Sequence, residues 1–279
     1  MSGADFFDDG FAINSYMDDQ VPVDIEKAKQ EHAAIKASFE EAGIEVIQVP
    51  APQNCQDGVY TANWALVRGG KAVMSNLPNK RQDEEAYAQA ELEKLGLQTV
   101  KLPAEYSFSG QGDALPCGKY LFVGTSYRTD HRVHPLLARE LGYEVIGIQT
   151  IPETDDAGQP VTNHVTGWPD SFFYDLDLAI AVIRPDLIAW CPEAFVPESQ
   201  ERIRALTDID KIEVSLEEAM QASACNLVST GETVIMGAGA PKLRAALEEK
   251  GLTVLPQDVT ELMKGGGFIR CCSLTLDNK

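Results

Sequence analysis

The chain has 279 residues, of which 44% are hydrophobic and 24% are charged, a mixture typical of a globular protein rather than a disordered, collagen-like or disulfide-scaffold chain. Its 23 Lys and Arg residues face 43 Asp and Glu residues, giving a formal net charge of −20. Such a charge repels phosphate backbones and anionic lipid surfaces, so we expect no nucleic-acid partner and no membrane partner.

The cysteines and the first residues indicate the compartment. No window reaches the 18 or so apolar residues that a membrane span needs. The first ten residues, MSGADFFDDG, lack the basic and apolar regions of a secretory leader. The six cysteines match no zinc-binding spacing, so we expect a reduced, cytoplasmic protein without a metal or organic cofactor. They are Cys55, Cys117, Cys191, Cys225, Cys271 and Cys272.

One pattern recurs along the chain: an amphipathic helix that ends at Gly and leads into a β-branched strand. The copies are FEEAGIEVIQVP (39–50), ELEKLGLQTVKLP (91–103), ARELGYEVIGIQTI (138–151), ALEEKGLTVLPQDV (246–259) and a degenerate RIRALTDIDKIEVS (202–215). Between copies lie pairs of apolar runs joined by polar turns, which predict β-hairpins. These pairs are ALVRGGKAVMS (65–75), ALPCGKYLFVGT (114–125), AVIRPDLIAWCP (181–192) and NLVSTGETVIMGA (226–238).

A fifth hairpin would require the C-terminal SLTL (273–276) to pair with the N-terminal FAINSYM (11–17), which would close a ring. The sequence therefore predicts a five-bladed, pseudo-fivefold α/β propeller of ββαβ units, forming one domain over residues 1–279. Helix–Gly–strand repeats are also compatible with a doubly wound parallel sheet, which stays an alternative. The Pro- and Gly-containing stretch 152–170 looks like an insertion rather than a domain boundary.

Unusual polar residues precede the first hairpin strand of each unit. The segments are QDGVYTAN (56–63), SGQGDAL (109–115), YDLDLAI (174–180), SACNLV (223–228) and GGGFIRCCSL (265–274). If the units are pseudosymmetric, these segments face one cavity, where carboxylates can bind a planar guanidinium and a thiolate can attack its central carbon. The residues placed there are Asp57, Asn63, Asp113, Asp175, Asp177, Asn226 and Cys271.

Each residue also has a plainer interpretation. Cys271 could be buried packing, and Asp113 could be an ordinary turn residue. Asp175 and Asp177 would point to one face if they alternate along a strand, an arrangement that is costly unless they are solvated or paired. His164 lies in the insertion, where a solvated side chain is the simplest expectation, although loop residues can reach a site.

These motifs together resemble the guanidino-group-modifying, or amidinotransferase, superfamily. The resemblance is carried in order by INSYM, QDGVYTANWALV, GQGDAL, VGTSYRTD and GGGFIRCCSLTL, and it spans nearly the whole chain. It is greatest to the dimethylarginine dimethylaminohydrolase and arginine dihydrolase branch, which shares the TAN sequence and the GGG…CC ending. The resemblance implies the five-bladed propeller that the repeats suggest.

The resemblance also implies a mechanism. In the family, a Cys thiolate attacks the guanidinium carbon, an amine leaves, and water hydrolyses the thiouronium intermediate with a His as acid and base and a Glu that orients it. Cys271 matches the family nucleophile, and Asp57 and Asn63 match positions that contact the guanidinium. Arg128 matches the residue that grips a substrate carboxylate, and Asn14 matches the Asn of the N-terminal strand motif.

Two departures concern the proton-transferring residues. The family segment Phe-Tyr-His-Leu-Asp is Phe-Tyr-Asp-Leu-Asp here, so Asp175 stands at the His position, and Ser109 stands at the Glu position. Three explanations remain open. Asp175 acts as the base, or His164 replaces the missing imidazole from the insertion, or the protein binds a guanidino or ureido ligand without turnover.

We predict a cysteine-dependent hydrolase of arginine, a methylarginine or another small guanidino compound, with a non-catalytic binding protein as the alternative. Cys271 is the predicted nucleophile and Asp175 the predicted acid and base. Asp113 and Asp177 would orient the guanidinium or the water. The sequence leaves self-association into a homo-oligomer open.

Overall fold

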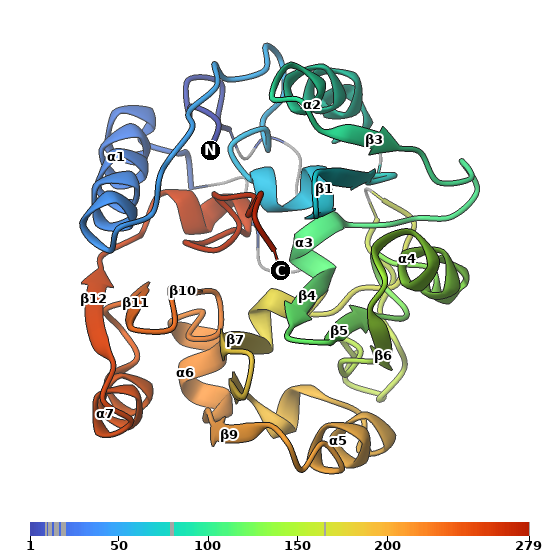
Figure 1. The fold of residues 1–279 in the computed structure, drawn as a ribbon, viewed down its shortest axis with the longest axis vertical. Helices are drawn as coiled ribbons and strands as arrows, with labels where there is room; N and C mark the ends of the chain where they lie inside the picture. The colour runs from blue at the N-terminus through green and yellow to red at the C-terminus, as the bar shows by residue number, and fades with distance from the viewer. Residues whose placement is uncertain are drawn as a thin grey trace.

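The computed structural model describes residues 1–8, 10, 13, 17, 21–78, 81–164 and 166–278. Helices and small sheets are arranged in a ring, with α1, α2, α4, α5 and α7 on the outside and the sheets closer to the centre (Figure 1). The C-terminus ends near the centre of this view, next to α3. The helices are α1 (Ile25–Glu41), α2 (Gln82–Lys94), α3 (Gly110–Asp113), α4 (His134–Leu141), α5 (Pro197–Arg204), α6 (Leu216–Gln221) and α7 (Pro241–Glu249).

Four separate three-stranded sheets carry the predicted repeat. In each sheet an antiparallel hairpin is extended by a third strand, parallel to the second, that follows the outer helix. The sheets are β1 (Ala65–Arg68), β2 (Lys71–Met74) and β3 (Gln98–Val100); β4 (Ala114–Cys117), β5 (Tyr120–Gly124) and β6 (Glu144–Ile148); β7 (Ile180–Arg184), β8 (Leu187–Trp190) and β9 (Asp210–Glu213); and β10 (Val228–Ser229), β11 (Thr233–Gly237) and β12 (Thr253–Gln257). The four predicted hairpins are confirmed, and one continuous doubly wound sheet is excluded for these strands.

The predicted fifth hairpin lacks its C-terminal strand. Residues 273–276 form no strand, because the side chain of Gln111 hydrogen-bonds the backbone of Thr275 on both sides, to its N–H at 3.0 Å and to its carbonyl at 2.7 Å. Most of 11–17 lies outside the described residues. The fifth unit is represented by α1 and by a parallel bridge between Ser2 and Val49, so the count of five blades stays a prediction.

The stretch 152–170 lies between β6 and the short 3-10 helix η4 (Leu176–Leu178). Two isolated bridges fold it back on itself, one between Thr154 and Pro160 and one between Thr162 and Pro169. The stretch thus connects the second sheet to the third, and its interpretation as an insertion rather than a domain boundary stays a prediction.

A carboxylate on α1 anchors the segment that leads to the C-terminal cysteines. Glu31 is buried and accepts hydrogen bonds from the backbone N–H groups of Thr260, Glu261 and Leu262 and from the Thr260 hydroxyl, at 2.9–3.0 Å. These groups start the 3-10 helix η6 (Leu262–Gly265), whose first N–H groups have no partner within the helix. Glu31 thus ties the first outer helix to the loop that carries Cys271.

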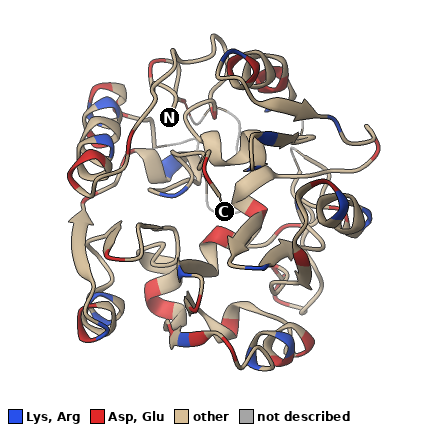
Figure 2. Cartoon of the chain, in the orientation of Figure 1, with Lys and Arg blue, Asp and Glu red and all other residues tan. Residues whose placement is uncertain are grey.

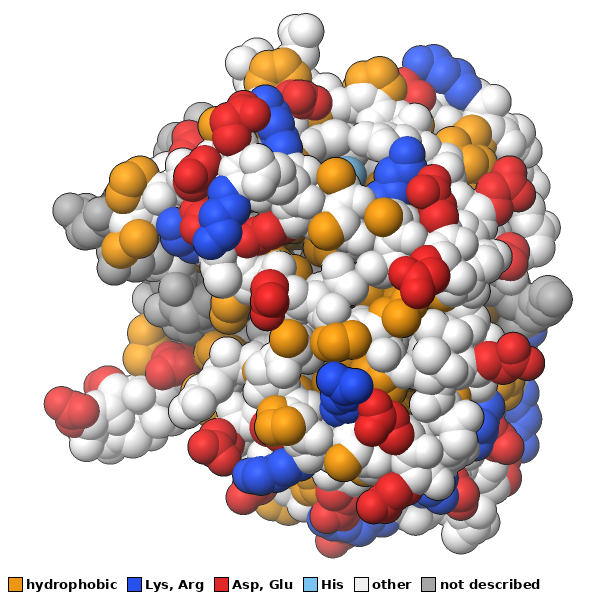
Figure 3. Space-filling view, turned by 90° about the vertical axis from the view of Figure 1, so that its left-hand side faces the viewer, with side chains coloured by type: hydrophobic (Ala, Val, Ile, Leu, Met, Phe, Trp, Pro, Cys, Tyr) orange, Lys and Arg blue, Asp and Glu red, His pale blue; other side chains and the backbone are white. Residues whose placement is uncertain are grey.

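Charge is distributed over the whole ring. Acidic residues lie on the outer helices and also near the centre, beside the end of the chain (Figure 2). On the face shown in Figure 3, Lys and Arg side chains lie beside Asp and Glu side chains. Acidic residues near the centre are the feature that bears on function, because buried carboxylates need partners.

Candidate active site

The segments that the sequence predicts to converge meet at a small cavity, which we call the Cys271 cavity. Its lining comes from the loop before β1, the start of α2, the segments before β4 and β7, and the loop after η6. The lining residues are Ile13, Asp57, Tyr60, Asn63, Pro78, Arg81, Ser109, Arg128, Tyr174, Asp175, Gly265, Gly267 and Cys271.

The Cys271 thiol is held by a carboxylate and an amide. Its Sγ donates to Asp177 Oδ2 at 3.3 Å and accepts from Asn226 Nδ2 at 3.1 Å. The carbonyl oxygen of the same Asn226 side chain accepts the backbone N–H groups of Arg270 at 2.8 Å and of Cys271 at 3.2 Å. Asn226 therefore fixes both the backbone and the sulfur of the predicted nucleophile.

The protonation of this pair follows from burial. Burial raises the pKa of the Cys271 thiol well above its usual value, and the carboxyl group of Asp177 raises it further. Burial also raises the pKa of Asp177 to about 8, and the neighbouring Asp175 acts in the same direction. At neutral pH the free site consequently holds a neutral thiol, which agrees with its role as hydrogen-bond donor.

Asp175, at the position where the resemblance places a histidine, has polar partners of its own. Its Oδ2 accepts from Asn63 Nδ2 at 2.7 Å and from Ser109 Oγ at 3.2 Å. Burial raises the pKa of Asp175, while the Arg128 charge and these two hydrogen bonds oppose that rise. Ser109 stands at the position where the resemblance places a Glu. The two residues that depart from the family pattern, Asp175 and Ser109, are therefore hydrogen-bonded to each other.

Three carboxylates at the site each keep one oxygen unused. The Oδ1 atoms of Asp57, Asp175 and Asp177 are buried and have no hydrogen-bond partner in the described part of the chain. Burial raises the pKa of Asp57 to about 7, against the opposing charge of Arg81. Buried oxygens without donors are costly, so Asp57 and Asp175, which line the Cys271 cavity, are suited to a ligand with several N–H groups.

The sequence suggests that Asp175 and Asp177 alternate along a strand, but in the structure they do not. Asp175 precedes the 3-10 helix η4 and Asp177 lies within it, so the tight turn separates the two side chains. Asp177 contacts the Cys271 thiol, whereas Asp175 contacts Asn63 and Ser109. The structure thus gives the two carboxylates different neighbours.

Asp113 lies behind the cavity and supports η4. Its Oδ1 accepts the backbone N–H of Leu176 at 3.1 Å, and it is absent from the lining of the Cys271 cavity. Burial raises its pKa well above the usual value, and the nearby Asp175 adds to that rise. This geometry makes Asp113 a support for the segment that carries both Asp175 and Asp177.

Glycines let the site loops approach one another. A Cβ on Gly112 would lie 2.3 Å from Asn63 Nδ2 and 2.6 Å from Asp175 Oδ2. A Cβ on Gly267 would lie 2.3 Å from the ring of Tyr60. Both distances are shorter than real contacts, so the glycines of the GQGD and GGG motifs are required by close packing at the site.

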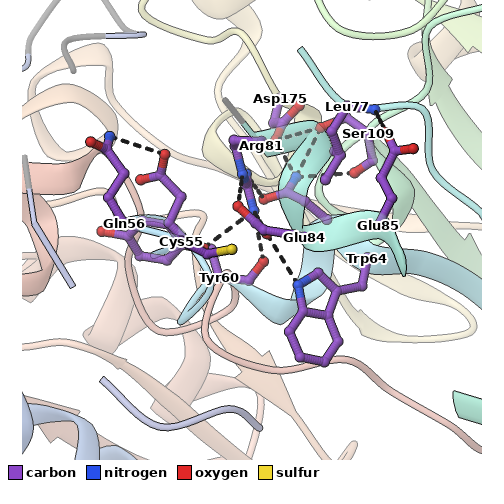
Figure 4. Close-up of polar contacts among 12 residues, drawn as sticks. Cys55, Gln56, Tyr60, Trp64, Leu77, Arg81, Glu84, Glu85, Ser109 and Asp175 are labelled. Atoms are coloured by element: carbon purple, nitrogen blue, oxygen red, sulfur yellow. Dashed lines mark hydrogen bonds and ion pairs between the residues drawn. The ribbon is translucent and has the colours of Figure 1, made fainter. Parts of the chain in front are cut away.

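Sequence reasoning missed Arg81, whose guanidinium lies between several of the site residues (Figure 4). It donates to both carboxylate oxygens of Glu84 at 2.9 and 3.0 Å and to Asn63 Oδ1 at 2.8 Å. Trp64 Nε1 also donates to Glu84, at 3.1 Å. The only sequence signal was an Arg three residues before a Glu at the start of a helix, a spacing common on exposed helices.

Arg128 lines the cavity as expected. Its Nη2 donates to the Ile13 carbonyl at 2.7 Å, and its guanidinium lies 4.7 Å from the ring centre of Tyr174. Tyr174 was not predicted as a site residue, and its hydroxyl donates to the Gly266 carbonyl at 2.8 Å. The stacked tyrosine holds Arg128 beside the carboxylates.

Two predicted residues are not placed in the site. His164 is exposed in the insertion and does not line the Cys271 cavity. Asn14 lies outside the described residues. Among the residues that the structure describes, no cluster of three or more His, Cys, Asp and Glu side chains could hold a metal ion.

Comparison with known proteins identifies the family. The family model for N,N dimethylarginine dimethylhydrolase, eukaryotic, matches residues 8–276. The chain belongs to this family. Among the residues that the structure describes, no helix of this protein is long and apolar enough to cross a membrane.

Relatives and solved structures extend the match over the whole chain. The N(G),N(G)-dimethylarginine dimethylaminohydrolase of Mycobacterium tuberculosis is 30% identical over 273 residues, covering 97% of this chain and 83% of that protein. The bifunctional arginine dihydrolase/ornithine cyclodeaminase ArgZ of Synechocystis is 29% identical, and the match covers 98% of this chain but 37% of that protein. The solved N-terminal domain of ArgZ, bound to product, has a TM-score of 0.86 at 28% identity, with 98% and 94% of the two chains covered. These relatives are hydrolases of guanidino compounds, and this chain has the same mixed α/β fold as the solved ArgZ domain.

Proposed function

We propose that this protein is a cysteine-dependent hydrolase of a small guanidino compound. The observation that carries the proposal is the cavity that the Cys271 thiol lines together with Asp57 and Asp175, each with one unused oxygen, while Asp177 accepts the thiol hydrogen bond. A guanidinium ion is planar, carries a full positive charge and has N–H donors in a fixed fork, so it matches this set of acceptors. The solved ArgZ domain that is covalently bound to a reaction intermediate supports the same chemistry.

The first proposed step forms an S–C bond between Cys271 Sγ and the guanidinium carbon. The thiol proton passes to a site carboxylate, a C–N bond breaks, and the leaving amine departs with a proton. Water then attacks the thiouronium carbon and gives one proton to a site carboxylate. The S–C bond breaks, the sulfur takes the second proton, and the ureido product and the thiol are released. A bound cation would favour this chemistry, because its charge lowers the pKa of the neighbouring thiol and carboxyl groups.

The roles of individual residues are part of the proposal. Asp177 contacts the thiol and is the nearest acceptor for its proton, and Asp175 serves as acid and base toward water and the leaving amine. Asp57 and Asn63 contact the guanidinium, with Asn226 positioning Cys271. In addition, Asp113 orients these groups through η4, Arg128 grips a substrate carboxylate, and Asn14 contributes from the N-terminal segment. His164 stays a prediction that its exposed position does not support.

The remaining parts of the proposal concern the whole protein. We place it in the cytoplasm as a single five-bladed α/β propeller without a cofactor. Four ββαβ units support the repeat, while the fifth rests on α1 and one bridge.

A second candidate function is binding of a guanidino or ureido ligand without turnover. It is favoured by the raised thiol pKa, which comes from burial, from Asp177 and, to a smaller extent, from Asp175 at the family His position. A carboxylate raises the pKa of a neighbouring thiol, whereas an imidazolium lowers it. Binding with no product, unchanged in Cys271→Ala, would identify this function.

The test is intact-protein mass spectrometry during incubation with arginine, methylarginines, agmatine and guanidino acids, with ammonia and amine release measured in parallel. We expect a substrate-dependent adduct on Cys271 and loss of product in Cys271→Ala. The matched control is Cys272→Ala, because Cys272 is adjacent in sequence and buried but does not line the cavity. A folded protein with neither adduct nor product over the whole panel would rule out the hydrolase.

A further inference from the structure

A second cavity reaches Asp177, the residue that accepts the hydrogen bond of the Cys271 thiol. It has a volume of about 280 Å³ and lies among β4, β7, β10 and the C-terminal segment. It shares no lining residue with the Cys271 cavity. We call it the Asp177 cavity, because Asp177 lines it and separates it from Cys271.

Two charged side chains, Asp177 and Arg270, line the Asp177 cavity where it comes nearest to Cys271. Asp177 is 1% exposed, its Oδ2 accepts from Cys271, and its Oδ1 has no partner among the described residues. Arg270 is fixed by hydrogen bonds from Nη2 to Gln111 Oε1 at 2.7 Å and from Nη1 to the Ser273 carbonyl at 2.8 Å. A fixed cation beside an acceptor without a donor is complementary to an anion that carries a neighbouring N–H group.

The walls and the rim restrict what can bind. Leu115, Ile180 and Leu227 contribute apolar wall, which suits a short aliphatic group. Arg184 adds a second cation and is paired with Asp186 at 3.5 Å. Because the whole chain carries a net charge of −20, a ligand with net negative charge is repelled on approach, whereas a zwitterion is not.

We propose that the Asp177 cavity binds a small amino-acid zwitterion. The ligand carboxylate contacts Arg270, its ammonium donates to Asp177 Oδ1, and a short aliphatic side chain lies against the apolar walls. This site has no lining residue in common with the Cys271 cavity but meets it at Asp177, and its ligand does not need to be a substrate.

The first experiment compares three probes of the same length by isothermal titration calorimetry. L-norvaline carries both charges, pentanoate lacks the ammonium group, and 1-aminobutane lacks the carboxylate. We expect norvaline to bind at least tenfold more tightly than either single-charge probe. Equal affinities for norvaline and pentanoate, or no norvaline binding, would overturn the proposal.

Variants then locate the binding site. Val182 lines the cavity and is partly exposed, so Val182→Trp should fill the space and reduce norvaline affinity at least tenfold, whereas Val182→Ala should not. Thr230→Trp blocks the exposed rim and serves if the first variant fails to fold. Unchanged affinity in folded Val182→Trp or Thr230→Trp protein would contradict the location.

Two further variants separate this proposal from the guanidino hydrolase. Asp177→Asn removes the charge that faces the ammonium group, so norvaline affinity should fall toward that of pentanoate. Asp57→Asn alters only the other cavity and should leave norvaline affinity within twofold of the wild-type value. Cys271→Ala removes the nucleophile of the proposed hydrolase but keeps Asp177 and Arg270, so it should still bind norvaline more tightly than pentanoate. If the protein hydrolyses no guanidino compound, norvaline binding to Cys271→Ala still tests the Asp177 cavity.

Discussion

At the scale of single residues, the distinctive feature is a cysteine whose neighbour is a carboxylate. A thiolate is the reactive form, and an adjacent negative charge together with burial makes that form unfavourable. Asp57 and Asp175, which line the cavity, become favourable partners only when a cation lies between them, and the same cation lowers the pKa of the nearby Cys271–Asp177 pair. Reactivity at Cys271 should therefore be coupled to occupation of the cavity by a guanidinium ion.

The first prediction concerns the thiol pKa of Cys271. Asp177→Asn removes the nearest negative charge, so the pH midpoint of Cys271 alkylation should fall by about one pH unit. The midpoint is measured from the rate of iodoacetamide modification of Cys271, followed by peptide mass spectrometry. Asp156→Asn, on the exposed part of the insertion, is the control and should leave the midpoint unchanged. A midpoint that rises in Asp177→Asn would show that Asp177 stabilises the thiolate.

The second prediction concerns stability and the buried carboxyl group of Asp57. Its pKa is about 7 in the folded protein and is near 4 in an unfolded chain, so folding favours the protonated form. This contribution is fully present below pH 4 and is lost as the pH rises through 7. The free energy of unfolding of Asp57→Asn, relative to that of the wild type, should therefore be greater at pH 8 than at pH 4. The expected difference is on the order of 2–4 kcal/mol.

Urea unfolding at both pH values measures this difference. Asp155→Asn, an exposed substitution in the insertion, controls for the general effect of removing one negative charge from an acidic protein. The same pH dependence in Asp57→Asn and in the wild type would mean that Asp57 ionises normally.

At the scale of elements, the site depends on how closely short segments pack. The single turn α3 lies against the segment that holds Asn63, and Gly112 is the point of closest approach. Glu31 on α1 plays the corresponding role for the turn before η6. Neither contact lies within one ββαβ unit, so the ring must be assembled before the site is complete.

The third prediction is that Gly112→Ala disrupts the pairing of Asn63 with Asp175. The added Cβ would lie within 2.6 Å of both side chains, and relieving that clash should cost roughly 1–3 kcal/mol of stability. Guanidinium binding by calorimetry should weaken at least tenfold. Gly158→Ala is the control, since its Cβ has no neighbour within 4 Å and only its left-handed backbone adds strain.

The fourth prediction is that Glu31→Gln destabilises the loop that carries Cys271. An amide nitrogen cannot accept the backbone N–H groups of Glu261 and Leu262, and a loss of about 2–4 kcal/mol is expected in urea unfolding. Hydrogen exchange should increase at 260–265 before it increases elsewhere. Glu41→Gln, exposed at the end of the same helix, should change neither quantity.

Local sequence patterns predicted the elements well where hydrogen bonds are local. The hairpins at 65–75 and 114–125 follow from alternating apolar runs and glycine turns, and the structure has them in those places. The strand expected at 273–276 fails because Gln111, more than 150 residues away, takes its backbone hydrogen bonds. Side-chain contacts of that range leave no local signal.

The same distinction applies to the site. Pseudosymmetry brought Cys271 and Asp177 together from segments far apart in sequence, and the structure places them in contact. It could not tell which of Asp175 and Asp177 faces the thiol, since that depends on the 3-10 turn between them. Arg81 was missed because its role depends on long-range contacts with Asn63 and the loop at 57–60.

At the scale of the whole molecule, the net charge of −20 acts on every charged ligand that approaches. Acidic residues occur both on the outer helices and near the centre of the ring (Figure 2). Their summed field attracts a guanidinium ion from solution and repels an anion, and dissolved salt screens that field. The contribution of the field can be separated from that of the site, because only the former depends strongly on ionic strength.

The fifth prediction uses this dependence. Between about 20 mM and 500 mM NaCl, the screening length falls from more than 20 Å to about 4 Å, so the affinity for agmatine should fall roughly three- to tenfold. Methylurea is planar and donates N–H groups but carries no charge, and its affinity should change by less than twofold. Calorimetric titrations over this salt range measure both ligands. Equal salt dependence of the two affinities would mean that the cavity recognises shape and hydrogen bonds alone, and that its buried carboxyl groups stay protonated when the ligand binds.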